Sequence, residues 1–157
     1  MEVISTPVIM TALKPPVPRR LITGNADHAG VIIGPDPAEL RAVRRWVAHN
    51  AHVSVSLNMD MRLVASELVT NTLRHTKSGL PDGQVTVEIL HESEAVVLRV
   101  TDDGPLNANE WPEINANQGT TGETGRGLFL VSSLCAYWDW VHNNGKTVVS
   151  ARFLRSE

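Results

Sequence analysis

The segment "ELVTNTLRHT" (residues 67–76) combines the apolar spacing of a helix with polar side chains that a packed helix does not need. We expect a helix from Met59 to His75, capped by Asn58, whose apolar side is made of Met61, Val64, Ala65, Leu68 and Thr72. A polar stripe borders that side and is made of Glu67, Thr70, Asn71 and Arg74. Solvent exposure would explain any one of these residues. The β-branched "VTNT", however, is a poor choice for an exposed helix with no other role.

The elements on either side of this helix predict the fold class. Short β-branched runs at residues 21–34 predict one or two strands, and "PDPAELRAVRRWVAHN" (35–50) predicts a helix capped by Asp36. Downstream, "QVTVEILHE" (84–92) and "AVVLRVTDD" (95–103) predict a hairpin. After the long segment 104–125, "RGLFLVSSLCAY" (126–137) predicts a helix. "WDWVHN" and "KTVVSARFL" predict a closing hairpin turned by "NNG" (143–145). This order favours an α+β two-layer sandwich, with helices on one face of a mixed or antiparallel sheet.

Length and composition limit the classes of protein that the chain can belong to. The 157 residues suit one domain, which we expect at residues 21–157 after a proline-rich tail at residues 1–20. A net charge of -3 argues against a nucleic-acid binder, and no apolar run reaches the roughly 18 residues that suggest a membrane span. We find no signal peptide, and the lone Cys135 lies in an apolar run, so we expect a cytoplasmic protein without a disulfide.

Two further segments carry candidate chemistry. "VTDDGP" (100–105) ends a strand with Asp102 and Gly104; a turn would explain it, but a carboxylate there could also accept a hydrogen bond from the amine of an adenine. We expect the missing side chain of Gly104 to let the ring approach. "GETGRGLFLV" (122–131) places Gly125 and Gly127 before a helix, where backbone N–H groups could hold phosphates. "GKT" (145–147) is not a P-loop, because the first glycine of that motif would fall at Trp140.

Taken in order, "ELVTNTLRHT", "VTDDGP", "GRGLFLV" and "GKTVVSARF" resemble the successive nucleotide-binding motifs of the GHKL ATPases. The resemblance covers residues 21–155 and implies the Bergerat ATP-binding fold. Within that superfamily, the small size and the form "ELVTN" look most like the bacterial anti-sigma factor serine/threonine kinases.

The resemblance implies a role for each matching residue. Asn71 would bind Mg²⁺, Asp102 with Gly104 would read the adenine amine of ATP, and Thr147 would support that adenine site. Gly125, Gly127 and the backbone of Arg126 would hold the phosphates beneath a lid made by residues 105–124. Glu67 would be the catalytic carboxylate that orients and deprotonates a serine hydroxyl.

The implied partners are a sigma factor and an anti-anti-sigma protein, which the kinase would phosphorylate, and a homodimer is also implied. The sequence departs from the family pattern at Leu106, which stands where many relatives have a second glycine. A non-catalytic, ATP-gated binding switch therefore stays open as an alternative. A detached histidine-kinase catalytic domain is a further alternative.

Overall fold

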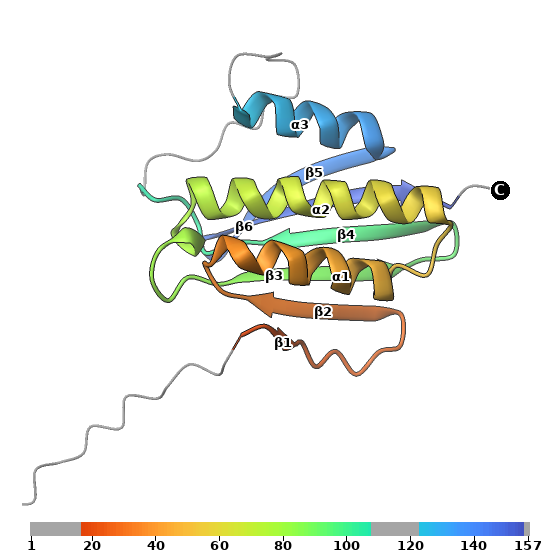
Figure 1. Ribbon diagram of the computed structural model, residues 1–157, viewed down its shortest axis with the longest axis horizontal. Helices are drawn as coiled ribbons and strands as arrows, with labels where there is room; N and C mark the ends of the chain where they lie inside the picture. The colour runs from red at the N-terminus through yellow and green to blue at the C-terminus, as the bar shows by residue number, and fades with distance from the viewer. Residues whose placement is uncertain (1–16, 108–122, 156–157) are drawn as a thin grey trace, which may run out of the picture.

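The computed structural model describes residues 17–107 and 123–155, which form a six-stranded sheet covered by helices (Figure 1). The strands lie in the order β1-β2-β3-β4-β6-β5, and every neighbouring pair is antiparallel. The elements in chain order are β1 Arg19–Arg20, β2 His28–Ile33, a 3-10 turn η1 Pro37–Glu39, α1 Leu40–Asn50, α2 Val55–His75, a second 3-10 turn η2 Lys77–Gly79, β3 Val85–His91, β4 Ala95–Thr101, α3 Glu123–Leu134, β5 Tyr137–Asn143 and β6 Lys146–Leu154. The predicted α+β sandwich is confirmed.

The three helices lie side by side on one face of the sheet. In Figure 1, α2 runs between α1 and α3, and it contacts both of them. Below the helices, α1 contacts β2 and β3, α2 contacts β3, β4 and β6, and α3 contacts β5. The helix layer therefore follows the strand order across the sheet, with α2 over its centre.

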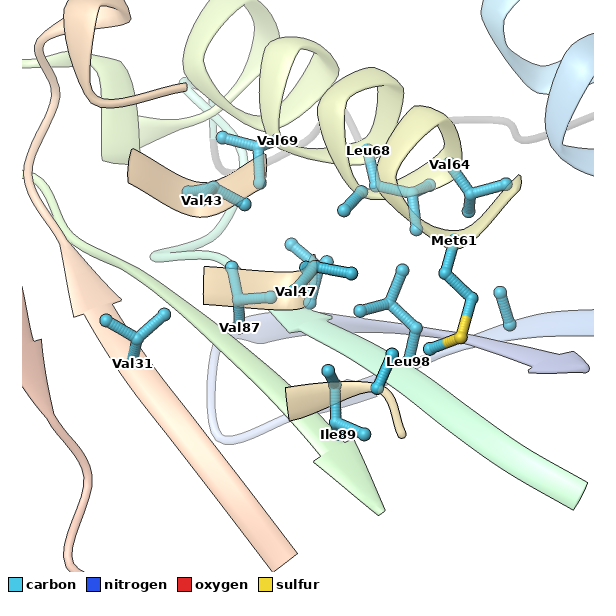
Figure 2. Close-up of a cluster of buried hydrophobic side chains, with 14 of the residues drawn as sticks. Val31, Val43, Val47, Met61, Val64, Leu68, Val69, Val87, Ile89 and Leu98 are labelled. Atoms are coloured by element: carbon cyan, nitrogen blue, oxygen red, sulfur yellow. The ribbon is translucent and has the colours of Figure 1, made fainter. Parts of the chain in front are cut away.

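The hydrophobic core fills the space between the helices and the sheet (Figure 2). Strand residues alternate between the two faces of the sheet, so every second residue of β3 faces the helices. The buried residues labelled in Figure 2 are Val31, Val43, Val47, Met61, Val64, Leu68, Val69, Val87, Ile89 and Leu98. This packing fixes the rotation of α2, because its apolar side must face the strands.

The start of α2 differs from the prediction. The helix begins at Val55, and the side chain of Ser54 caps it by accepting the N–H of Leu57 at 3.2 Å. The predicted cap, Asn58, lies inside the first turns, where its side-chain amide donates to the carbonyl of Ala48 at 3.1 Å. Ser54 takes the cap because its backbone is not helical (φ -57°, ψ 158°), whereas Asn58 ties α2 to α1.

The third helix is also shifted from the predicted range 126–137. It spans Glu123–Leu134, and the chain leaves it because the N–H of Ala136 donates to the carbonyl of Arg152 in β6 at 2.9 Å. Tyr137 then pairs with Arg152 as the first residue of β5.

At the other end of the chain, the sheet begins at Arg19, not at Leu21. The segment "LITG" (21–24), part of the predicted β-branched runs, forms no strand, and the strand within residues 21–34 is β2. Both predicted hairpins are confirmed.

Candidate functional site

Asp102 is a buried carboxylate at the end of β4, held by backbone groups from two parts of the chain. Its Oδ1 atom accepts the N–H of Gly104 at 2.7 Å and the N–H of Thr147 at 3.2 Å. Burial raises the pKa of Asp102, although both backbone N–H groups favour its charged form. Within the described residues nothing donates to Oδ2. The carboxylate is therefore fixed in orientation and keeps one oxygen as an acceptor for a donor such as an amine.

Gly104 shapes the turn beside this carboxylate. Its φ is +96°, and a Cβ added to it would lie 2.1 Å from the carbonyl oxygen of Gly145. The absent side chain thus admits the backbone of the β5–β6 turn. The expectation that it also lets a ligand ring approach stays a prediction. The glycine is required because two backbone segments meet at this point.

Thr147, the second residue of β6, lies next to Asp102 and is almost fully buried. Its carbonyl accepts the N–H of Asp102 at 2.9 Å, so the two residues are bonded in both directions. The Thr147 hydroxyl also lies 3.5 Å from Nδ1 of His142 on β5. The structure therefore brings together the predicted pair Asp102 and Thr147, and it adds His142, which sequence reasoning did not single out.

A short segment after α2 joins the helix to the Asp102 turn, and the sequence reasoning missed it. The N–H of Lys77 donates to the carbonyl of Gly104 at 2.9 Å. The buried hydroxyl of Ser78 donates to the carbonyl of Gln84 and accepts the N–H of Asp103, at 2.7 and 2.8 Å. The sequence of this segment, "SGLPDG" (78–83), predicts only a turn. The available signal was its serine, since a hydroxyl can serve one acceptor and one donor at a chain crossing.

Glu67 and Asn71 lie on the part of α2 that faces α3. Successive residues of a helix are rotated by about 100° about its axis. Measured from the direction of the buried Leu68, Val69 points about 100° and Asn58 about 80° to the same side. Asn58 bonds to α1, so this is the α1 side. Glu67 and Asn71 point about 100° and about 60° to the opposite side, and both are half-buried. Because α3 covers that opposite side (Figure 1), the predicted stripe faces α3.

The glycine-bearing segment occupies the beginning of α3, across from this stripe. Gly125, Arg126 and Gly127 all lie inside α3, which starts at Glu123, so Gly125 does not precede the helix as the predicted range 126–137 implied. Only N–H groups of a first helical turn lack partners within the helix, so Gly125 is placed to offer one and Gly127 is not. Most of the predicted lid, residues 105–124, lies outside the described residues.

The described residues contain no cluster of three or more His, Cys, Asp or Glu side chains that could hold a metal ion. Asn71 can supply one amide oxygen, which is the donor type that Mg²⁺ accepts. This suits a metal held mainly by phosphate oxygens and water.

The comparisons with known proteins agree with this geometry. The family model for the histidine kinase-like ATPase domain matches residues 33–153, which is most of the chain. The chain belongs to this family. The match contains Glu67, Asn71, Asp102, Gly104, Gly125, Gly127 and Thr147. A histidine kinase-like ATPase domain uses ATP, and the acceptor oxygen of Asp102 suits an adenine amine.

Curated relatives carry a more specific name. The Serine-protein kinase RsbW of Listeria monocytogenes is 27% identical over 118 residues, which cover 71% of this chain and 75% of the relative. The protein of the same name from Listeria innocua is 26% identical over the same coverage. In the part of the chain that the structure describes, no helix combines the length and apolar character needed to cross a bilayer.

Proposed function

We propose that this histidine kinase-like ATPase is a protein serine/threonine kinase that phosphorylates an anti-anti-sigma protein and sequesters a sigma factor. The observation that carries the proposal is the joining of two half-sites. Asp102 and Thr147 form a fixed acceptor site, and Glu67 with Asn71 faces the glycine-bearing helix α3. The bond from Lys77 to Gly104 connects the helix of one half-site to the turn of the other. The names of the Listeria relatives support the serine-kinase activity.

Each residue then has a defined task. Oδ2 of Asp102 accepts the adenine amine, and Thr147 holds the carboxylate in place. Asn71 contributes an amide oxygen to Mg²⁺, and N–H groups of the first turn of α3, including that of Gly125, face the phosphates. When bound, ATP would supply the transferable phosphoryl group, and Mg²⁺ would neutralise part of the negative charge on the phosphates.

Glu67 acts on the protein acceptor. Its carboxylate orients a serine hydroxyl and accepts the proton as the oxygen attacks the γ-phosphorus. The bond between that phosphorus and the bridging oxygen breaks, and ADP leaves with its electron pair. The half-buried position of Glu67, one turn from Asn71, places a base beside the proposed metal ligand.

A second candidate is the ATP-gated binding switch without catalysis, and Leu106 is the observation that favours it. This side chain is exposed just beyond the Asp102 turn, at the position where many relatives have a glycine. In a switch, ATP would bind and control a protein interface, and no phosphoryl group would be transferred.

One set of variants separates the two candidates. The kinase proposal predicts that Glu67→Gln lowers phosphoryl transfer to the acceptor protein by about 10²-fold or more while ATP affinity is kept. Asp102→Ala should abolish ATP binding in both cases. Glu94→Gln, in the exposed β3–β4 turn, is the matched control. If the wild-type protein binds ATP but transfers no phosphoryl group with any partner present, the kinase proposal fails and the ATP-gated binding switch remains.

A further inference from the structure

The residues of α2 that lead up to Glu67 form an exposed apolar row. Val55, Met59 and Leu63 follow one another at four-residue spacing, and Glu67 and Asn71 continue the same spacing. The exposed fractions of the three apolar residues are 79%, 57% and 43%. Single exposed apolar residues are ordinary on a protein surface. Three in line on one helix ridge, ending at a proposed catalytic carboxylate, form a surface that another protein can pack against.

Two arginines lie on the side of α1 that faces α2. Val43 and Val47 face the core, and Trp46 and His49 line a cavity beside β1 and β2, so that side of α1 faces away from α2. On the helical wheel, Arg41 and Arg44 lie on the other side, toward α2. Both are exposed, and they form no ion pair within the described residues. The helix layer thus presents an apolar ridge with positive charge along its α1 side.

We propose that Val55, Met59 and Leu63, together with Arg41 and Arg44, form the docking surface for the phosphoacceptor protein. This inference rests on the proposed kinase function and names how its substrate is held. The occupant is an amphipathic helix of the acceptor, with apolar side chains about one turn apart, acidic residues beside them and the acceptor serine at one end. Helices pack ridge against groove along such four-residue rows.

The geometry of the row sets the position of the serine. Successive members of the row are one turn apart, about 6 Å along the axis, so Val55 lies about 18 Å from Glu67. An acceptor helix that contacts all three apolar residues ends within reach of Glu67. The arginines select an acidic partner and set its direction along α2, because complementary charges fix register.

The test compares substitutions on the row with a matched substitution elsewhere. Met59→Gln and Leu63→Gln keep side-chain length and helix propensity and remove only apolar contact. The control is Leu154→Gln, because Leu154 is 58% exposed and, next to buried Phe153 on β6, points to the sheet face opposite the helices. The acceptor is the protein of the host lysate that the wild-type chain labels with radioactive ATP, which is then purified for kinetics.

We expect each row substitution to raise the KM for the acceptor by about tenfold, the effect of losing one buried apolar contact. The kcat and the affinity for ATP should stay within about twofold, which a misfolded variant would not achieve, and Leu154→Gln should leave all three unchanged. Arg44→Glu should raise the KM further at low salt than at high salt.

Three outcomes would overturn the inference and can be told apart. An unchanged KM in the Met59 and Leu63 variants, with wild-type transfer intact, refutes the docking surface and leaves the kinase function standing. Wild-type protein that binds ATP but labels no protein refutes both. Sedimentation of the same variants gives a third outcome: loss of a dimer on Met59→Gln would assign the row to a second copy of this chain and refute the acceptor.

Discussion

Gly104→Ala provides the sharpest test of how the Asp102 turn is built. The new Cβ would lie 2.1 Å from the carbonyl oxygen of Gly145, whereas ordinary contacts begin at 3.4 Å. The two backbones would have to separate by roughly 1 Å, which close-packed interiors resist. The left-handed φ of +96° adds about 1–2 kcal/mol for a residue with a side chain, and the overlap adds about 1–3 kcal/mol. We expect the free energy of unfolding to fall by about 2–5 kcal/mol.

Gly145→Ala is the matched control, because Gly145 also has a positive φ, +77°, but a Cβ there meets nothing within 4 Å. It should lose only the conformational part, about 1–2 kcal/mol. The assay is urea unfolding followed by circular dichroism, with ATP affinity measured in parallel. Gly104→Ala should also weaken ATP binding, since separating the turns disturbs the 2.7 Å bond from the Gly104 N–H to Asp102. Equal stability losses in the two variants would refute the steric reasoning.

Three further predictions concern single side chains. Ser78→Ala should lower the free energy of unfolding by about 1–3 kcal/mol, because it leaves the half-buried N–H of Asp103 and carbonyl of Gln84 without their partner; Ser93→Ala, in an exposed turn, should change it little in the same urea titration. Asp102→Asn should abolish most ATP binding by calorimetry without destabilising the fold at pH 7, because burial raises the pKa of Asp102 and makes its ionised form costly. Burial raises the pKa of Glu88, but hydrogen bonds from Arg99 and His28 outweigh the effect of burial, so the pKa of Glu88 is lowered. The contribution of ionised Glu88 to stability is present above its ordinary pKa of 4.5 and should disappear as the pH falls through the lowered pKa. In Glu88→Gln, the free energy of unfolding should therefore fall less steeply with decreasing pH over this range.

The fold could be predicted from the sequence because its signals are local. Apolar spacing located α2, and alternation with the "NNG" turn located the hairpin of β5 and β6, whose turn residues Asn144 and Gly145 have the positive φ values of 53° and 77°. The errors lie at element ends. Ser54 replaced Asn58 as the cap because the choice between two good capping residues depended on the contact between α1 and α2.

The candidate site was predicted less completely, for the same physical reason. The pattern of polar residues on α2 singled out Glu67 and Asn71 as candidates, since a stripe on one helix is a local feature. The contacts of Ser78 with Gln84 and Asp103 join segments that the sequence separates, so no local pattern contains them. Gly104 was recognised, but the group that fills its space, the carbonyl of Gly145, comes from another hairpin.

The "GKT" segment, which is not a P-loop, contacts the Asp102 turn of the candidate site. Each of its residues contacts one residue of the Asp102 turn: the Gly145 carbonyl lies against Gly104, Nζ of Lys146 lies 3.3 Å from Asp103, and the Thr147 N–H donates to Asp102. No phosphate-binding loop is needed for this, because the contacts position a carboxylate. The orientation of Asp102 therefore depends on the turn of the β5–β6 hairpin. An insertion in that turn should reduce ATP affinity even though every proposed ligand-binding side chain is retained.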